Sequence, residues 1–200
     1  GLEIVKQTKL CEEWMNQYPT IFVSFRQVDG LDFVGAYGML EMVISDLFKE
    51  HLYLLDSGNV SEFDKEIMKQ LLWRKASVID VKGSLILLTR MLKSHYGKQV
   101  VLLMDEYDVP VSKASSNGYY QEMLNVVKAI LSTALKDNPS LKFAVITGCL
   151  KITKESIFTG TNNFVSDRLS DNGTRRRFVN FCTGWIIGTG DSKCRDSGNF

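Results

Sequence analysis

Three carboxylates follow a run of apolar residues in the middle of the chain. Val100 to Met104 are all apolar, and Asp105, Glu106 and Asp108 come directly after them. A short run without polar residues is typical of a strand buried on both faces of a parallel sheet. Residues after such a strand lie at the carboxyl edge, where open α/β sheets bind ligands. Because unpaired carboxylates are costly to bury, these acids need a cation, a hydrogen-bond donor or water.

This arrangement is typical of the Walker B element of nucleoside triphosphatases. In that element the first acid, here Asp105, helps to hold Mg²⁺. The following acid, here Glu106, orients and deprotonates the attacking water. The alternative is a core strand that enters a solvated acidic turn, because short motifs often match by chance.

A second buried strand ends in a polar residue further along the chain. Leu141 to Ile146 predict a strand that ends at Thr147 and Gly148. Parallel neighbours present their carboxyl ends side by side, so Thr147 is a candidate for sensing water or phosphate beside Asp105. The alternative for a Thr-Gly pair at this place is an ordinary turn.

Helices are predicted between the strands. An earlier strand is predicted at Ile21 to Phe25, preceded by a short helix around Leu10 and Trp14. Apolar residues recur at helical spacing at about 33–55, 61–72, 80–96 and 119–136. Pro110 to Gly118 predict a loop. Strands and helices therefore alternate, which predicts an α/β fold with a parallel, doubly wound sheet flanked by helices.

Residues at the ends of these helices match capping preferences. Asp32 and Asp80 are the predicted N-caps of the first and third long helices. Gly97 is the predicted C-cap of the third, directly before the strand that begins at Val100.

Size and composition are those of a soluble globular protein. The chain has 200 residues, of which 44% are hydrophobic and 24% charged, enough for one domain with or without a small appendage. A formal net charge of +1 predicts no general nucleic-acid or anionic-membrane surface. No apolar run reaches the roughly 20 residues of a membrane span. The first residues lack the pattern of a signal peptide, so we expect a cytoplasmic protein.

The cysteine and histidine patterns predict no zinc site. The four cysteines are far apart and form no Cys-x-x-Cys pair, and the only histidines are His51 and His95. We therefore expect neither a zinc site nor a disulfide framework. His51 is expected at the end of a helix, in a surface or helix-terminal role.

Several motifs taken together resemble the AAA-ATPase-like domain family. They are Tyr18-Pro19 with Ile21 to Phe25, Asp105-Glu106-Tyr107-Asp108 before Pro110, Gly118-Tyr119-Tyr120, Thr147-Gly148, Lys154-Glu155-Ser156-Ile157-Phe158 and Asn162-Asn163. The similarity covers roughly residues 1–168, which we expect to form one domain. It implies a P-loop NTPase-like fold that uses ATP and Mg²⁺.

The resemblance also implies roles for individual residues. Asp105 and Glu106 match the Walker B acids of the family, and Asp108 matches its third acid. Thr147 would sense the γ-phosphate. Relatives usually carry Arg where this chain has Lys151, and Lys keeps the charge of Arg but loses its planar fork for binding phosphate.

The phosphate-binding loop of the family is absent from this sequence. Full-length relatives begin with a Gly-Lys-Thr loop, but these residues contain no Gly-x-x-x-x-Gly-Lys-Ser/Thr, and the nearest stretch, 188–193, lacks the Gly-Lys pair. The phosphate cradle depends on backbone N–H groups at a loop and a helix N-terminus. We therefore expect a partial, N-terminally truncated domain and Mg-ATP hydrolysis only in the intact protein.

The resemblance ends after about Asp167. Family members continue with an aromatic Tyr-Phe-Gly-Phe-Thr stretch, whereas residues 169–200 are crowded with Gly, Ser, Asp and Arg without regular periodicity. We interpret them as an irregular or disordered tail, such as a frameshifted coding end would give. The alternative is that Arg175 to Arg177 contact phosphate or nucleic acid.

Three functions compete. The first is a fragment of an ATP-binding P-loop ATPase-like protein that assembles as a homo-oligomer or with a nuclease-like domain, since many relatives end with a PD-(D/E)xK nuclease domain. The second is a non-catalytic scaffold or regulatory module of a nuclease-associated protein. The third is a metal-dependent nuclease that uses Asp105, Glu106 and Asp108, although the Glu/Asp-x-Lys set of that fold is not evident.

Overall fold

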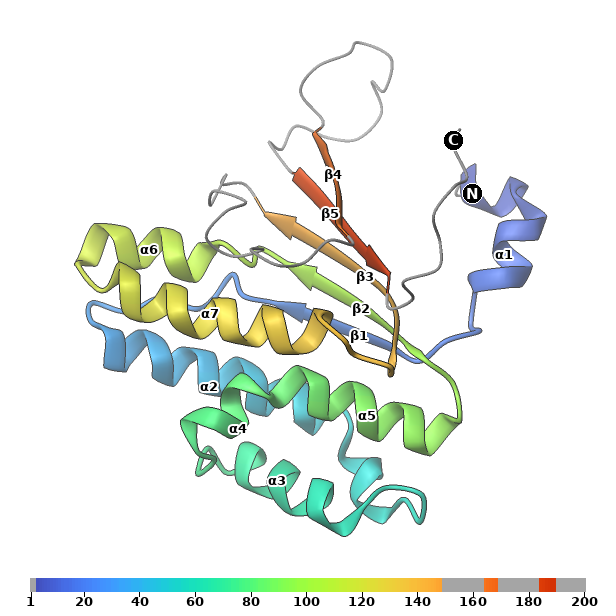
Figure 1. Ribbon diagram of the computed structural model, residues 1–200, viewed down its shortest axis with the longest axis horizontal. Helices are drawn as coiled ribbons and strands as arrows, with labels where there is room; N and C mark the ends of the chain where they lie inside the picture. Colours follow the sequence, from blue (N-terminus) through green and yellow to red (C-terminus); the bar gives the residue numbers. More distant parts are fainter. Residues whose placement is uncertain (1–2, 149–163, 169–183, 190–200) are drawn as a thin grey trace.

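A five-stranded sheet organises the molecule, which a computed structural model describes at residues 3–148, 164–168 and 184–189 (Figure 1). Its strands are β1 (Thr20–Ser24), β2 (Val100–Asp105), β3 (Leu141–Gly148), β4 (Phe164–Arg168) and β5 (Gly184–Thr189). The spatial order is β1-β2-β3-β5-β4. The first three strands are parallel, and β5 runs antiparallel to both β3 and β4. The predicted α/β fold with a parallel sheet is confirmed, and β4 and β5 are strands that the sequence did not predict.

Helices make up most of the remaining described chain. They are α1 (Thr8–Trp14), α2 (Phe33–Lys49), α3 (Glu62–Leu72), α4 (Val78–Lys82), α5 (Ser84–Tyr96), α6 (Val109–Asn117) and α7 (Tyr120–Leu135), with short 3-10 turns η1 (Glu3–Lys6) and η2 (Leu52–Asp56). None of the described helices has the length and apolar character needed to cross a membrane.

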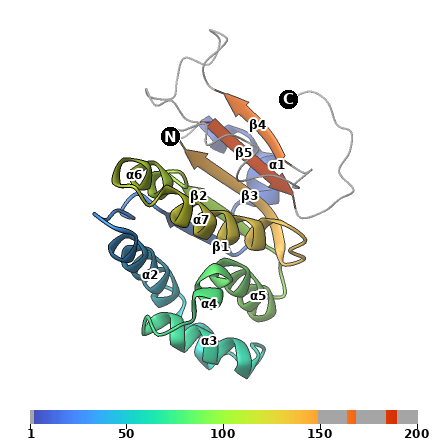
Figure 2. The same ribbon diagram turned by 60° about the vertical axis from the view of Figure 1, so that its left-hand side comes forward.

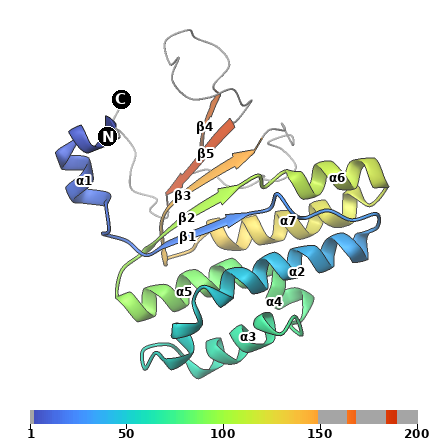
Figure 3. The same ribbon diagram turned by 180° about the vertical axis from the view of Figure 1, so that it is seen from behind.

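Helices α2 to α7 lie on one side of the parallel strands, and α3 lies in the outer part of this layer against α2 and α5 (Figures 1 and 3). The segment from α2 to α5 connects β1 with β2, and α6 and α7 connect β2 with β3. Right-handed crossovers that step in one direction across a sheet place their helices on the same face. Ile21, Leu102 and Ile146 on that face are completely buried, whereas Phe22 on the other face is 59% exposed.

The predicted double winding is therefore wrong for the described residues. Of the described helices, α1 alone approaches the second face of the sheet (Figures 2 and 3). Its Trp14 ring lies 6.0 Å from the ring of Phe143 in β3. Apart from this contact with α1, the described helices cover the parallel strands on one side.

Two of the three predicted helix caps are confirmed. The Asp32 carboxylate accepts a hydrogen bond from Gly35 N at 2.8 Å at the start of α2, and Gly97 ends α5 with a left-handed φ of 67°. The prediction for Asp80 is wrong. Ser77 occupies the cap position because its hydroxyl accepts from Asp80 N at 3.1 Å. Asp80 lies inside the short helix α4, and α5 is a separate helix.

The predicted loop from Pro110 to Gly118 is wrong as well. This segment forms α6, and it carries proline in the first turn, where a missing N–H costs nothing. Val111 and Ala114 are buried. Gly118 then ends the helix with a φ of 84°. Packing of one apolar face thus outweighs the turn-forming tendency of the Ser and Asn residues.

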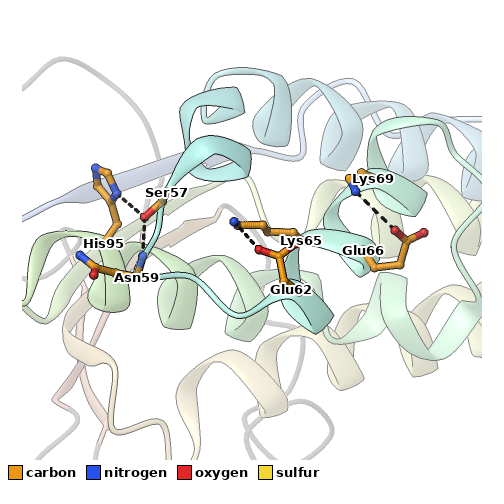
Figure 4. Close-up of polar contacts among 7 residues, drawn as sticks. All are labelled: Ser57, Asn59, Glu62, Lys65, Glu66, Lys69 and His95. Carbon is orange, nitrogen blue, oxygen red and sulfur yellow. Dashed lines mark hydrogen bonds and ion pairs between the residues drawn. The ribbon is translucent and has the colours of Figure 1, made fainter.

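Charged groups attach α3 to the rest of the helical layer. Arg90 of α5 donates two hydrogen bonds to the Asp64 carboxylate, at 2.6 and 2.9 Å. This bond raises the pKa of Arg90 further above its ordinary value. On α3 itself, Lys65 pairs with Glu62 at 2.7 Å (Figure 4). Of these two pairs, Asp64–Arg90 joins α3 to α5, whereas Lys65–Glu62 lies within α3.

Candidate functional site

Asp105 and Thr147 meet at the carboxyl edge of the parallel strands. The register pairs Met104 of β2 with Ile146 of β3, so the residues that follow are neighbours. The Thr147 hydroxyl donates a hydrogen bond to the Asp105 carboxylate. Both residues are half-buried. The structure thus brings together two residues that the sequence placed at neighbouring strand ends, and their chemical roles stay predictions.

Ser24 extends this polar row to a third strand. It is the register partner of Asp105, and the next residue, Phe25, donates its N–H to Asp105 O at 3.0 Å. Alternate residues of a strand share a face, so Ser24 lies on the same face as exposed Phe22. Sequence reasoning missed Ser24, although it also ends an apolar run at the carboxyl end of a strand.

Glu106 begins the turn after β2 with an unusual backbone conformation. Its φ is 52°, in the left-handed region that a residue other than glycine seldom adopts. Tyr107 N donates to Thr147 O at 3.3 Å, and Val109 N donates to Glu106 O at 3.2 Å. Such conformations cluster at functional sites, where the surroundings hold them in place. Here, hydrogen bonds on both sides of the turn fix the backbone from which the Glu106 carboxylate extends.

Tyr107, Asp108 and Gly148 form a close contact behind this turn. Tyr107 and Asp108 are only 4% and 2% exposed. A Cβ at Gly148 would lie 2.5 Å from Asp108 Oδ1 and 2.6 Å from Tyr107 Cε1, so a side chain does not fit there. Burial, assisted by the negative charge of Asp108, raises the pKa of Tyr107 to about 12. The turn after β2 therefore requires glycine at position 148, because any side chain there would clash with Tyr107 and Asp108.

The donor set at this edge fits Mg²⁺ together with a phosphate ligand. Magnesium prefers oxygen ligands and is usually held by one or two carboxylates, water and substrate phosphates. Asp105 offers the carboxylate, with the Thr147 hydroxyl beside it. Among the described residues, no group of three His, Cys, Asp or Glu side chains is placed to hold a metal ion. Phosphate and water would have to complete the coordination.

The positions of the three acids count against the metal-dependent nuclease. That hypothesis needs Asp105, Glu106 and Asp108 to converge on a metal. The structure buries Asp108 against the position of Gly148. The described residues therefore lack the carboxylate cluster that such a nuclease requires.

Two predicted basic features lie outside the described residues. One is Lys151, the candidate phosphate contact, and the other is Arg175 to Arg177, the candidate nucleic-acid contact. Their roles stay predictions.

The two histidines lie away from this site and have hydrogen-bonding partners of their own. His95 lies in the last turn of α5, at the end that precedes β2. Its Nδ1 is 2.8 Å from the hydroxyl of Ser57, which follows η2 (Figure 4). His51 Nδ1 is 3.2 Å from the Tyr53 hydroxyl. Burial lowers the pKa of His51, against the opposing charge of Glu50. Both imidazoles therefore take part in local structure beside η2.

Comparison with known proteins adds a family to this geometry. No curated protein matches the chain, and no solved structure matches it. A family model described as predicted AAA-ATPase matches residues 1–158. Because this match covers more than half of the 200 residues, the chain belongs to the AAA-ATPase-like family.

Proposed function

We propose that this chain supplies the Walker B half of an Mg-ATP site in an ATPase-like protein. The observation that supports the proposal is the hydrogen bond from Thr147 to Asp105 across two parallel strands, at their carboxyl edge. In this proposal Asp105 holds Mg²⁺, Glu106 orients the attacking water, and Thr147 senses the γ-phosphate. Lys151 adds a positive charge near the phosphates. Bound Mg²⁺ neutralises charge that develops on the phosphate oxygens.

The other half of the site, in this proposal, comes from polypeptide outside these 200 residues. The sequence contains no Gly-x-x-x-x-Gly-Lys-Ser/Thr. A phosphate cradle needs consecutive backbone N–H groups at a loop and a helix N-terminus, and side chains such as Asp105 and Thr147 cannot replace them. ATP hydrolysis is consequently a property of the completed protein.

Substitution of Glu106 tests the catalytic part of this proposal. ATP turnover is measured on a longer polypeptide in which this chain follows a phosphate-binding loop. Glu106→Gln keeps the size and removes the base, so turnover is expected to fall by about 100-fold or more. The dissociation constant for Mg-ATP is expected to change little. The matched control is Glu66→Gln on the exposed side of α3, and unchanged turnover in Glu106→Gln would remove Glu106 from the mechanism.

A non-catalytic scaffold or regulatory module is the second candidate. The absence of a phosphate-loop motif from the sequence favours it. Under this hypothesis the α/β core presents surfaces to another domain, such as a nuclease-like one. Labelled ATP separates the two candidates, because a scaffold fails to bind it even when a phosphate-binding loop precedes the chain.

A further inference from the structure

Ser24 is a polar residue of the carboxyl edge to which the proposed Mg-ATP site gives no role. It ends β1 and is the register partner of Asp105 in β2. Thr147 of β3 is the neighbour of Asp105 on the other side. Because register partners on adjacent strands share a face of the sheet, the three side chains form one row with Asp105 in the middle.

The two carboxylate oxygens of Asp105 differ in their partners. On the β3 side, the Thr147 hydroxyl donates a hydrogen bond to Oδ1. The other oxygen, Oδ2, accepts no hydrogen bond from the part of the chain that the structure describes. Asp105 is half-buried. Since a partly buried carboxylate oxygen needs a donor, water or a cation, Oδ2 is available to a ligand.

The Ser24 hydroxyl also has unused hydrogen-bonding capacity. Its Oγ accepts a hydrogen bond from the N–H of Arg26 at 3.4 Å. A serine hydroxyl accepts two hydrogen bonds and donates one. One acceptor position and the hydroxyl proton therefore have no partner among the described residues. Ser24 is only half-buried, so water reaches this hydroxyl.

The spacing of β1 and β2 suits a water molecule shared by Ser24 and Asp105. Neighbouring strands lie about 4.8 Å apart. A water molecule bridges two oxygens at this spacing when it lies about 2.8 Å from each. Magnesium keeps several of its waters when a protein binds it, and each of these waters has two hydrogens to donate.

We infer that Ser24 is a positioning residue for hydrated Mg²⁺, an inference that rests on the proposed Mg-ATP site. One water molecule of the ion donates a hydrogen bond to Asp105 Oδ2 and a second to Ser24 Oγ. The Ser24 hydroxyl keeps its own hydrogen for a phosphate oxygen. Ser24 thus orders the hydration of the ion on the side of Asp105 that Thr147 does not occupy.

The requirement for Mg²⁺ tests this inference without a measurement of turnover. The longer polypeptide, in which this chain follows a phosphate-binding loop, is loaded with a fluorescent, non-hydrolysable ATP analogue and titrated with Mg²⁺. Ser24→Ala is expected to raise the half-saturating concentration of Mg²⁺ about 10-fold, as the loss of an outer-shell partner of a metal does. Affinity for the analogue in EDTA is expected to stay at the parent value, whereas general damage to the site would lower it.

A pair of variants with equal shape separates the hydroxyl from the size of the side chain. Ser24→Thr keeps the hydroxyl, and Ser24→Val puts a methyl group in its place; both residues suit a strand. The Thr variant is expected to stay within about threefold of the parent requirement for Mg²⁺, and the Val variant to match Ser24→Ala. Thr20→Ala is the control, because it removes a hydroxyl that bonds Tyr18 O at 3.3 Å at the other end of β1.

The possible outcomes distinguish this inference from the proposed function. A parent-like requirement for Mg²⁺ in Ser24→Ala, together with lost turnover in Glu106→Gln, would overturn the role of Ser24 alone. Equal weakening by Ser24→Thr and Ser24→Val would also overturn it, because the hydroxyl would then not be the group that acts. A completed polypeptide that does not bind the ATP analogue would overturn both.

Discussion

At the scale of single residues, the turn after β2 depends on the missing side chain of Gly148. An added Cβ would lie 2.5 Å from a carboxylate oxygen of Asp108 and 2.6 Å from the Tyr107 ring. Both neighbours are buried, so neither can move aside cheaply. We expect Gly148→Ala to lower the free energy of unfolding by about 1–3 kcal/mol, as overpacking does. Urea denaturation followed by circular dichroism measures this loss.

Gly58→Ala is the matched control for that substitution. Nothing lies within 4 Å of a Cβ built on Gly58. The free energy of unfolding is therefore expected to stay within about 0.5 kcal/mol of the parent value. Equal losses at the two glycines would contradict the close contact at Gly148.

The Tyr107 phenol gives stability an alkaline pH dependence. Burial first, and the charge of Asp108 second, raise its pKa from 10.0 to about 12 in the folded state. The neutral phenol is thus favoured by folding, so its contribution is complete below pH 10 and is lost as the pH rises toward 12. Urea titrations at several pH values above 9 are expected to show a smaller decline in unfolding free energy for Tyr107→Phe than for the parent chain.

A surface tyrosine separates this effect from general alkaline destabilisation. Tyr120 is 39% exposed at the start of α7. Tyr120→Phe removes an exposed phenol and serves as the comparison variant. If the stability of Tyr107→Phe declines with pH as steeply as that of the parent chain, the phenol of Tyr107 is not the group that titrates.

At the scale of elements, strand ends could be predicted from the sequence and helix boundaries only in part. The pairing of Asp105 with Thr147 was predictable because each ends a continuous apolar run, and parallel strands place such ends together. Helix α6 was not, because Pro110 and Gly118 are turn residues by local preference. Burial of Val111 and Ala114 decides the outcome there, and burial depends on distant parts of the chain.

The Asp64–Arg90 pair provides a test of how α3 is held on α5. Arg90→Ala removes two hydrogen bonds, at 2.6 and 2.9 Å, from the carboxylate of Asp64. Asp64 is only 9% exposed. Since the Arg90 side chain is itself 49% exposed, solvent screens part of the loss. We expect the free energy of unfolding to fall by about 1–3 kcal/mol. Chemical denaturation provides the measurement.

The control breaks a pair with little burial. The ammonium of Lys49 lies 2.8 Å from the Asp46 carboxylate, but both side chains are more than half exposed, at 57% and 59%. Lys49→Ala is expected to change stability by less than about 0.5 kcal/mol. A loss equal to that of Arg90→Ala would show that burial of Asp64 adds nothing to the link.

At the scale of the whole molecule, the sequence could not show which faces of the sheet are covered. Val101 and Leu103 in β2 are as apolar as their neighbours, which is why the strand predicts burial on both faces. The structure leaves these two side chains half-buried, because both crossovers lie on the other face. Apolar periodicity identifies strands and helices, but the direction of successive crossovers is a property of the assembled chain.

Two adjacent residues of β1 test this one-sided layering. Ile21 points into the helical layer and is fully buried, whereas Phe22 points to the second face and is 59% exposed. Ile21→Ala is expected to cost about 2–5 kcal/mol, the range for buried aliphatic side chains. Phe22→Ala is expected to cost less than about 1 kcal/mol, although it removes a larger side chain. Both are measured by urea denaturation. Equal losses at the two positions would mean that the second face of the sheet is also covered in the folded protein. The Asp105 side chain, which lies on that face, would then be covered and not exposed to solvent.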